Sequence, residues 1–431
     1  MNKRAATKFR KQASRVEAGL PEAIRQLVLP MIAGMEVTKT GLLAFVHTMG
    51  RAALDELLGM EAERIAGPKG KRDPGRQAHH WGTTSTPLPF GGRDIVVERP
   101  RVRSKNGREV ALPLIDELRR RDPLPDRVAE QIVLGVSTRG YARSLEPVAP
   151  GTRTRRASKS SASRALIEKT QERMGAFLNR RLDTLDIVAM FLDGLEVASQ
   201  TVIVALGVTR DGTKVPLGLW LGSTENAAVC TSLVQNLVER GLKIDRKILC
   251  AIDGGKGIRK ALCDVLGSSA VIQRCQVHKT RNVRDHLPES RKAYVSGQMR
   301  EAYRSRSAKV AKKRLLQLVS WLDNNGEDAA AASLREGLDE TLTVLKLDLP
   351  PTLCRTFSTT NAIENMNGAI RRITRNVKRW RGGPMIRRWV ALAMVEAQKK
   401  FRRVKGHVHM PALVAALRPE APTVEAKKDV A

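Results

Sequence analysis

The chain has 431 residues, of which 42% are hydrophobic, so it is long enough for several domains with buried cores. Its 76 lysines and arginines against 44 aspartates and glutamates leave a net charge of +32. Folding does not require such an excess, which favours nucleic acid as the partner over a membrane surface or a ribosome. Only 3% of the residues are aromatic, which argues against base-stacking binders of single strands and favours contact with duplex backbone.

The cysteines and the N-terminus indicate where the protein works. Its five cysteines are unevenly spaced, which argues against a disulfide framework and fits a reducing cytoplasm. The basic start of the chain is not followed by an apolar run, and Arg25 and Pro30 interrupt the next apolar stretch. We therefore expect a cytoplasmic protein with no signal peptide and no membrane-spanning helix.

The first part of the chain is predicted to be mainly helical. Residues 1–20 form a basic, flexible arm, and residues 21–180 follow with helical apolar spacing in their first third. A segment rich in Gly, Pro and Arg then interrupts the helices. Within it, Ile95 and Val102 mark a short β-ribbon near residues 90–103.

Helical signals return over residues 112–147. A turn and a serine-rich segment then open a further helix, whose first turns carry Lys159 and Arg164. Residues 132–178 are therefore interpreted either as a helix-turn-helix with a DNA-recognition helix or as an ordinary basic helix.

From residue 181 the pattern changes to apolar runs of strand length with helical segments between them. Strands are predicted at residues 185–193, 201–208, 215–221, 247–253 and 270–272, and helices at 227–242 and 257–266. Asp211-Gly212 is predicted to form the hairpin turn between the second and third strands. This order predicts an α/β fold in which an antiparallel meander is extended by strands that join through helical crossovers.

The strand signal disappears after residue 278. Residues 279–355 are charged and rich in Ala and Leu, hence helical, with a break at 324–326. Residues 356–405 contain one or two long basic helices, and residues 406–431 form a C-terminal tail that ends in disorder.

Three carboxylates stand out by position. Asp193 ends the first predicted strand, Asp253 ends the fourth, and Glu364 lies in the first turn of a late helix. The first and fourth strands are expected to be neighbours, which would bring the two aspartates together. Clustered carboxylates in a basic protein are costly unless a cation joins them, and Mg²⁺ prefers oxygen ligands. Two such ions would suit phosphodiester cleavage and strand transfer.

Each carboxylate also has a simpler interpretation. Asp193 and Asp253 both precede glycine and would fit ordinary turns. Glu364 stands three residues after Asn361, which is the spacing of a capping box.

The helix that follows Glu364 has one apolar side and one basic side. Apolar residues recur at three- and four-residue spacing from 363 to 377. The basic side chains are Arg371, Arg372, Arg375, Lys378 and Arg379. Solvated charged faces normally mix signs, whereas no acidic residue occurs here between Glu364 and Glu396. We therefore favour phosphate contacts over a merely solvated face.

Four motifs in order give the chain a resemblance to a known family. They are Phe-Leu-Asp-Gly at 191–194, Ala-Ile-Asp-Gly-Gly at 251–255, Gln-Arg-Cys-Gln-Val-His-Lys at 273–279 and Thr-Thr-Asn-Ala-Ile-Glu-Asn-Met-Asn at 359–367. In these motifs, and in segments 135–139 and 160–164, the chain resembles the mutator-like bacterial insertion-sequence transposases over residues of about 130 to 405.

The resemblance implies an Asp-Asp-Glu triad, Asp193, Asp253 and Glu364, on a ribonuclease-H-like mixed sheet. Residues 181–278 would be the first part of that core, 279–355 a helical insertion and 356–405 the helices that complete it. Residues 21–180 would bind DNA ends. The implied cofactor is two Mg²⁺ ions, with Mn²⁺ as substitute, both held by the triad.

Three further residues gain a role from the resemblance. Cys275 and His278 lie near the active site in the family pattern; they have the spacing of half a zinc site, but a hydrogen-bonded structural pair is preferred. Trp321 lies in the helical insertion, where related transposases place a Trp near the cleaved DNA end. A core tryptophan beside Leu318 and Leu322 is the simpler interpretation.

The sequence thus predicts a DNA transposase that acts on terminal inverted repeats and target DNA in the bacterial nucleoid, as a homodimer or a larger synaptic complex. Two alternatives stay open. A structure-specific nuclease of the same fold would cut DNA without joining strands, and a non-catalytic DNA-binding derivative would do neither.

Overall fold

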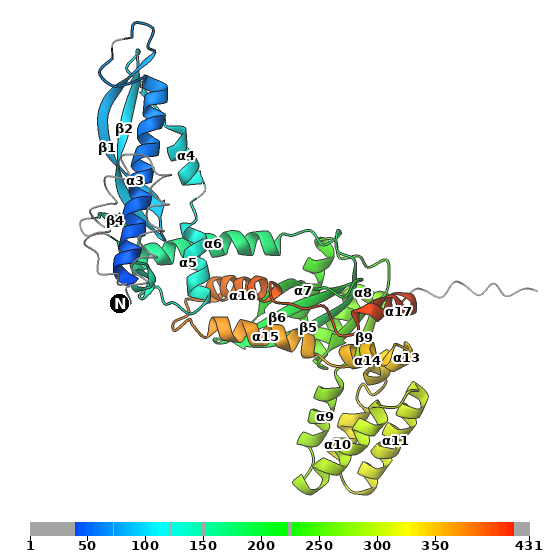
Figure 1. Cartoon of the computed structure of the whole chain (residues 1–431). Coiled ribbons are helices and arrows are strands. Elements are labelled where there is room, and N and C mark those ends of the chain that lie inside the picture. The colour runs from blue at the N-terminus through cyan, green and yellow to red at the C-terminus, as the bar shows by residue number, and fades with distance from the viewer. Residues whose placement is uncertain (1–38, 72, 121, 149–151, 223–225, 418–431) are drawn as a thin grey trace, which may run out of the picture. The chain divides into compact units, whose positions relative to one another are not determined.

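The computed structural model describes residues 39–71, 73–120, 122–148, 152–222 and 226–417. The chain divides into two compact units, residues 1–169 and 170–431, which we describe separately (Figure 1). The predicted arm at 1–20 and the predicted disorder at 418–431 lie outside the described residues. Within the described ranges, no helix combines the length and apolar character that crossing a membrane requires.

The first unit contains a long helix packed on an antiparallel sheet. Helix α3 (Lys39–Ala66) lies against the hairpin of β1 (Ala78–Phe90) and β2 (Arg93–Ser104). Strands β3 (Glu109–Val110) and β4 (Thr154–Arg155) both pair with β2. The core joins Leu58 of α3 and Val97 of β2 to Ile115 of α4 (Pro113–Arg120).

The β-structure of this unit is more extensive than the short ribbon predicted near residues 90–103. The hairpin turns at Gly91-Gly92, whose φ angles of +57° and +83° suit the tight turns that match the twist of paired strands. Strand β1 was not predicted because its middle, from Trp81 to Ser85, is polar and largely exposed. Such a segment lacks the apolar alternation from which a strand is recognised.

The described residues do not show the predicted helix-turn-helix near 132–178. Helix α5 (Leu124–Val133) and helix α6 (Lys159–Leu178) are separated by the 3-10 helix η1 (Tyr141–Ser144) and by β4. In that motif, a turn of about three to four residues joins the two helices. The serines that open α6 do begin a helix, as predicted, but its N-terminus follows a long connection.

The second unit is built on a five-stranded mixed sheet in the order β7-β6-β5-β8-β9. The strands are β5 (Ile187–Val197), β6 (Gln200–Thr209), β7 (Lys214–Gly222), β8 (Ile248–Ile252) and β9 (Ala270–Arg274). The first three form an antiparallel meander, whereas β8 runs parallel to β5 and β9 parallel to β8. The predicted strands, their order and the α/β class are confirmed, and so is the turn at Asp211-Gly212.

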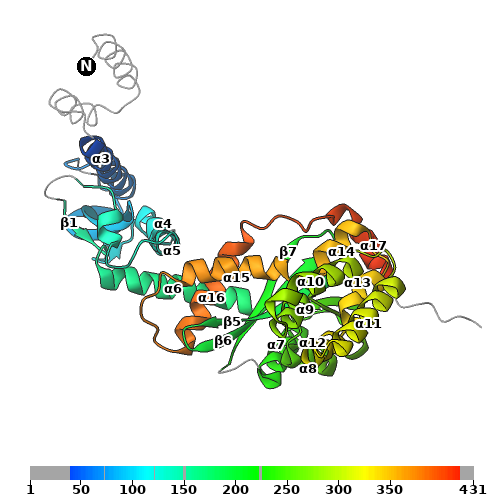
Figure 2. The same ribbon diagram turned by 90° about the horizontal axis from the view of Figure 1, so that it is seen from below.

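Helices cover both faces of this sheet (Figure 2). On one face, α7 (Ala227–Glu239) and α8 (Lys256–Leu266) share an apolar core with Leu192 and Ile252. On the other face, α15 (Asn361–Thr374) lies against β5 and α16 (Gly383–Gln398) against β7. Helices on both faces explain why β8 and residues 187–192 of β5 are continuously apolar rather than alternating.

The helical segment between β9 and α15 forms a bundle with its own core (Figure 1). It contains α9 (Gln276–Asp285), α10 (Glu289–Tyr303), α11 (Ala308–Asn324), α12 (Asp328–Arg335), η3 (Asp339–Leu342), α13 (Thr343–Lys346) and α14 (Pro351–Phe357). The predicted helices are confirmed, and so is the break, because α11 ends at Asn324 and Gly326 has a φ of +72°. The short helices η4 (His407–His409) and α17 (Met410–Ala416) follow α16.

Candidate active site

The pairing of β5 with β8 places two aspartates side by side. The parallel register ends at Leu192 opposite Ile252, and Asp193 and Asp253 are the next residues of the two strands. Neighbouring strands lie about 4.8 Å apart, so these residues leave the paired region next to each other. The prediction that Asp193 ends its strand is wrong, because β5 continues to Val197 in its hairpin with β6.

The aspartate on β5 faces α15. Leu192 belongs to the core shared with α7 and α8, so Asp193 points to the opposite face. Phe191, also on that face, stacks on Phe357 with ring centroids 5.9 Å apart. There Asn367 of α15 donates from Nδ2 to Asp193 Oδ2 over 2.7 Å.

The aspartate on β8 opens a sharp turn. Its Oδ1 accepts a hydrogen bond from the backbone N–H of Gly255 at 2.9 Å. Gly254 between them has a φ of +112°, a conformation that glycine adopts without a steric penalty. The turn leads from β8 directly into α8, so the interpretation of Asp253 as a turn residue is correct, and it is compatible with a place in the site.

Helix α15 also carries Glu364, in its first turn and one turn before Asn367. Residues three apart on a helix lie on neighbouring positions of its surface, so Glu364 stands beside the residue that holds Asp193. The capping-box interpretation of Glu364 with Asn361 is wrong, because Thr360 occupies the N-cap position. The Thr360 hydroxyl donates to Glu364 Oε1 over 2.6 Å.

The Cys-x-x-His pair lies against the same helix terminus. The Cys275 sulfur accepts a hydrogen bond from the backbone N–H of His278 at 3.5 Å. It also lies 3.4 Å from the Thr360 hydroxyl oxygen, whose single proton it shares with the nearer Glu364 Oε1. His278 Nδ1 lies 3.3 Å from Thr360 Oγ1 and 3.9 Å from Glu364 Oε1. Thr360, which is fully buried, thus links the pair to Glu364.

These contacts shift the acidity of both members of the pair. Hydrogen bonding with Cys275 is the largest cause of the raised pKa of His278; burial opposes it, and the charges of Asp253 and Glu364 add to it. Burial raises the pKa of the Cys275 thiol, but the hydrogen bonds with His278 and Thr360 outweigh burial and leave the pKa below its usual value. The negative charge of Asp253 therefore acts on His278, the side chain whose Nδ1 lies 3.9 Å from Glu364 Oε1.

We call Asp193, Asp253 and Glu364 the carboxylate site. Its donors are hard carboxylate oxygens, and two of its members follow the last paired residues of adjacent strands. This fits Mg²⁺, which is commonly held by one or two carboxylates and keeps several waters. However, no group of three or more His, Cys, Asp or Glu side chains in the described ranges is arranged to enclose a metal ion.

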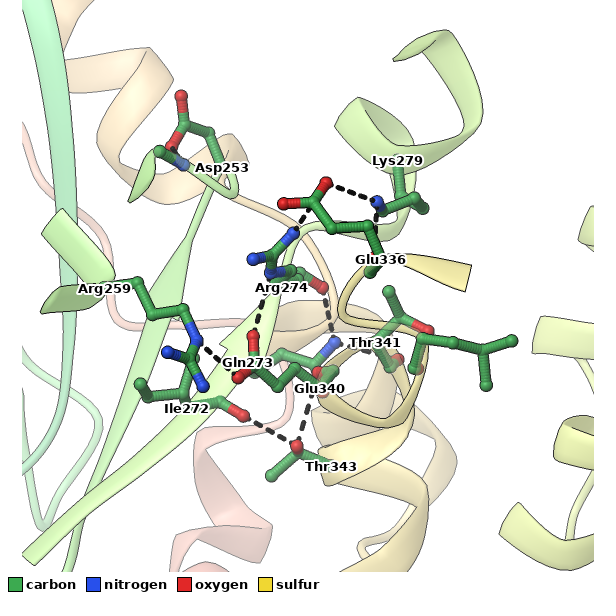
Figure 3. A network of polar contacts seen from close by, with 12 residues as sticks. Asp253, Arg259, Ile272, Gln273, Arg274, Lys279, Glu336, Glu340, Thr341 and Thr343 are labelled. Carbon is green, nitrogen blue, oxygen red and sulfur yellow. Dashed lines mark hydrogen bonds and ion pairs between the residues drawn. The ribbon is translucent and has the colours of Figure 1, made fainter. Parts of the chain in front are cut away.

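A second group of charged residues anchors the helical bundle to the sheet (Figure 3). We call Arg259, Arg274, Lys279, Glu336 and Glu340 the ionic network. Arg274 Nε donates to Glu340 Oε2 at 2.8 Å, and Arg259 Nε donates to Glu340 Oε1 at 2.7 Å. Lys279 Nζ donates to the backbone oxygens of Ser333 and Glu336, both at 2.7 Å.

The ionic network continues into neutral hydrogen bonds. Gln273 Nε2 donates to the Thr341 carbonyl, and Gln273 Oε1 accepts from the Val344 N–H, both at 2.9 Å. Thr343 Oγ1 donates to the Ile272 carbonyl at 2.6 Å. Strand β9 is thereby tied to η3 and α13, and Asp253 lies at the margin of this network (Figure 3).

The residues predicted to contact DNA are exposed but do not form one helical stripe. Lys159 and Arg164 lie on the exposed side of α6. Arg371 and Arg372 lie on α15, and Arg375 is its C-cap residue. The remaining two, Lys378 and Arg379, lie in the following loop, so the prediction of a helical face that reaches residue 379 is wrong. The helix ends at Thr374, although apolar spacing continues to Val377.

Trp321 packs into the helical bundle. It is half-buried against the core of α9–α12, and its ring centroid lies 4.8 Å from that of Tyr294. The Arg291 guanidinium lies 5.9 Å from the Trp321 ring. Tyr294 itself is exposed, so the pair reaches the surface of the bundle.

Sequence reasoning did not single out Thr360 or Asn367. Asn367 lies four residues after Ile363 and three before Ile370, so it is a polar residue inside the apolar stripe of α15. A polar residue within an apolar stripe could have been recognised from the sequence as a candidate for a buried hydrogen bond. Thr360 gave no signal of its own, because a threonine before a helix is an ordinary cap residue.

Comparisons with known proteins identify the family of the chain. The family model described as "Transposase, Mutator family" matches residues 29–404. The transposase for insertion sequence element ISRM5 from Rhizobium meliloti is 26% identical over 372 residues, which cover 84% of this chain and 89% of the relative. The transposase for insertion sequence element IS905 from Lactococcus lactis is 26% identical over 350 residues, or 79% and 83% of the two chains.

A third relative, the transposase for insertion sequence element IS256 in transposon Tn4001 from Staphylococcus aureus, is 28% identical over 262 residues. The match covers 56% of this chain and 62% of that protein. The family model itself spans both units of the structure and all three members of the carboxylate site. The chain therefore belongs to the Mutator family of transposases.

Proposed function

We propose that this transposase binds the terminal inverted repeats of an insertion sequence, cleaves DNA strands at the element's ends and joins a 3′-hydroxyl to a target phosphodiester. The observation that supports it most is the register of β5 and β8, after whose last pair Asp193 and Asp253 follow side by side, and the contact of α15 with β5. Asn367 ties that helix to Asp193, and Glu364 precedes it by one turn.

Asp193 and Asp253 would hold divalent cations together with Glu364, in the Asp-Asp-Glu arrangement on a ribonuclease-H-like core. Two Mg²⁺ ions, or Mn²⁺ in their place, would activate the attacking oxygen and stabilise the leaving one. The protein's own contribution is to orient the carboxylates. Thr360 donates to Glu364 and Asn367 to Asp193, so each carboxylate on this face is directed by a neutral donor.

The proposed DNA contacts use exposed basic residues. Arg371, Arg372 and Arg375 continue along the exposed side of α15 from Glu364, and Lys378 and Arg379 follow in the loop. Guanidinium groups suit phosphate oxygens, because they donate several hydrogen bonds in a fixed plane. They would hold the backbone on either side of the phosphodiester that is cut.

The remaining contacts concern the DNA ends and their pairing. Lys159 and Arg164 of α6 would contact the inverted repeats, and Trp321 would stack on a base displaced at the cleaved end. Two ends must be processed together, so we expect a homodimer or a larger synaptic complex on the bacterial chromosome.

The test is a cleavage and joining assay with purified protein, Mg²⁺ and DNA that flanks its gene. The wild type should nick the element's ends and produce joints to a target. Asp253→Asn should reduce both products by at least about 10³-fold, because several kcal/mol of charge stabilisation in the transition state depend on the metal. Its binding to the same DNA should persist in a gel-shift measurement.

A matched control separates the site from a general loss of charge. Asp245 is an exposed aspartate that precedes β8, and Asp245→Asn should leave the rate unchanged. Nicks without joints would identify a nuclease, and tight binding without nicks would identify a non-catalytic DNA-binding protein. Cleavage by Asp253→Asn at the wild-type rate would overturn the proposed role of the carboxylate site.

A further inference from the structure

Asn367 occupies a position of α15 where an apolar residue is expected. Only 2% of its surface is exposed, and Ile363 and Ile370 precede and follow it on the same helix face. A buried amide lowers stability unless its N–H and carbonyl groups both find partners. A leucine at this position would pack without that cost, so the amide calls for a functional reason.

One end of the amide is satisfied. Nδ2 donates to Asp193 Oδ2 over 2.7 Å. Because an ionised carboxylate only accepts hydrogen bonds, this contact determines which end of the Asn367 side chain faces Asp193.

The other end is not satisfied. Asn367 Oδ1 is buried and has no hydrogen-bond partner among the described residues. An unsatisfied buried acceptor costs about 1–3 kcal/mol. The orphaned oxygen belongs to the same side chain that holds Asp193, and Glu364 lies one turn before it on the helix.

We propose that Asn367 is a positioning residue of the cation site, an inference that rests on the proposed function. Its Nδ2 orients Asp193, and its Oδ1 accepts a hydrogen bond from a water molecule that the divalent cation carries into the site. Mg²⁺ retains several waters when it binds to carboxylates, and each of them is a hydrogen-bond donor. The buried acceptor is then satisfied when the cation is bound.

This role differs in a measurable way from a purely structural one. A residue that only supports the fold lowers stability when it is replaced, whether or not metal is present. A residue that surrounds the ligands of a metal changes metal affinity by about 10- to 100-fold. Replacing Asn367 with leucine removes the unsatisfied acceptor but also takes the donor from Asp193 Oδ2, so it should lower stability without metal by about 1–3 kcal/mol at most. Metal affinity of the folded variant is therefore the measurement that separates the two roles.

The experiment compares Asn367→Leu with Asn365→Leu in the full-length protein without DNA. Asn365 is exposed on the same helix and serves as the matched control. Mn²⁺ affinity is measured from the electron paramagnetic resonance signal of the free ion, and unfolding by urea is measured in EDTA. Asn367→Leu should stay folded in EDTA, with a urea midpoint at or modestly below that of the wild type, and should bind Mn²⁺ about 10- to 100-fold more weakly. Asn365→Leu should match the wild type in both.

A second variant guards against a folding defect. Asn367→Asp keeps an oxygen in the place of Oδ1 but sets a second carboxylate against Asp193. Without metal, the two like charges should lower the melting temperature. Mg²⁺ should then raise it by more than in the wild type, because binding to the folded state alone stabilises that state. A melting temperature as insensitive to Mg²⁺ as that of Asp193→Asn would contradict the proposal.

The outcomes separate this inference from the function on which it rests. If the wild type binds Mn²⁺, Asp193→Asn does not, and Asn367→Leu binds like the wild type, then Asn367 has no part in the cation site although the site exists. If the wild type binds no better than Asp193→Asn, the proposed metal site is itself wrong, and the role of Asn367 is lost with it.

Discussion

The carboxylate site and the ionic network both lie near the ends of neighbouring strands. They differ in the groups that contact their carboxylates. In the ionic network, the carboxylates of Glu336 and Glu340 meet the cationic groups of Arg259, Arg274 and Lys279. In the carboxylate site, Asp253 accepts from a backbone N–H and Glu364 from the Thr360 hydroxyl. The carboxylates of the first group pair with arginine and lysine side chains, whereas Glu364 lies 3.9 Å from His278, which is charged only when protonated.

On the proposed function, the difference separates charges that hold the fold from charges that bind a cation. Buried ions need a partner of opposite sign, because desolvation costs several kcal/mol per ion. The side chains of Arg274 and Lys279 are 6% and 3% exposed, and their partners are in place. Glu364 is 43% exposed, so water can screen it until a cation and a substrate arrive. Substitutions in the two groups should therefore affect different properties.

The largest effect is expected at Arg274. Arg274→Met should lower the free energy of unfolding by about 3 kcal/mol, because it removes the buried cation that pairs with Glu340 and one of the two that pair with Glu336. Urea unfolding measures this. Arg259→Met is the matched control, since Arg259 binds the same Glu340 but is 44% exposed, and it should cost less than about 1 kcal/mol. Equal losses of unfolding free energy from both variants would contradict the distinction between the buried arginine and the exposed one.

The next effect extends the comparison to cations without a carboxylate partner. Arg371 and Arg375 make no ion pair with any described residue, so they should serve DNA rather than the fold. Replacing both with glutamine should make the plot of the logarithm of the DNA association constant against the logarithm of salt concentration less steep by about 2. Each lost phosphate contact accounts for about 0.9 of that slope. Binding to unrelated duplexes should weaken equally. Salt titrations of DNA binding by fluorescence anisotropy measure both, and an unchanged slope would show that these arginines touch no phosphate.

A smaller effect is expected at Thr360, which directs Glu364 from the N-cap position of α15. Thr360→Val removes the hydroxyl and should slow single-turnover cleavage about tenfold, within the range seen for residues that orient metal ligands. Stability should change by about 1 kcal/mol or less, since water can reach the exposed Glu364. Thr360→Ser, which keeps the hydroxyl, should recover the rate. If the serine variant were as slow as the valine variant, the hydroxyl would not be the group that matters.

The sheet of the second unit could be predicted because its strands are buried on both faces. The apolar runs before Asp193 and Asp253 have the length of strands, and helical segments between them imply parallel crossovers. The polar strand β1 and the end of α15 at Thr374 could not be predicted. Exposed Thr and Gly residues from 82 to 85 carry no burial pattern, and apolar spacing through Val377 continued past the end of the helix.

Strand order was enough to predict that Asp193 and Asp253 follow neighbouring strands, but the side chains that contact the carboxylates could not be predicted. Sequence spacing indicates which face of α15 a residue occupies, not which atom it contacts. The bond from Asn367 to Asp193 joins residues 174 positions apart, and that from Thr360 to Cys275 joins residues 85 apart. Such contacts depend on how helix and strand are packed, and only coordinates show them.

The insertion of a whole helical bundle between β9 and α15 has a consequence for how the protein is made. Both aspartates leave the ribosome early, whereas Glu364 and Asn367 follow only after the bundle has been synthesised. A polypeptide truncated within the bundle therefore carries Asp193 and Asp253 without Glu364. On the proposed function, such a partial product could not cut the chromosome that encodes it.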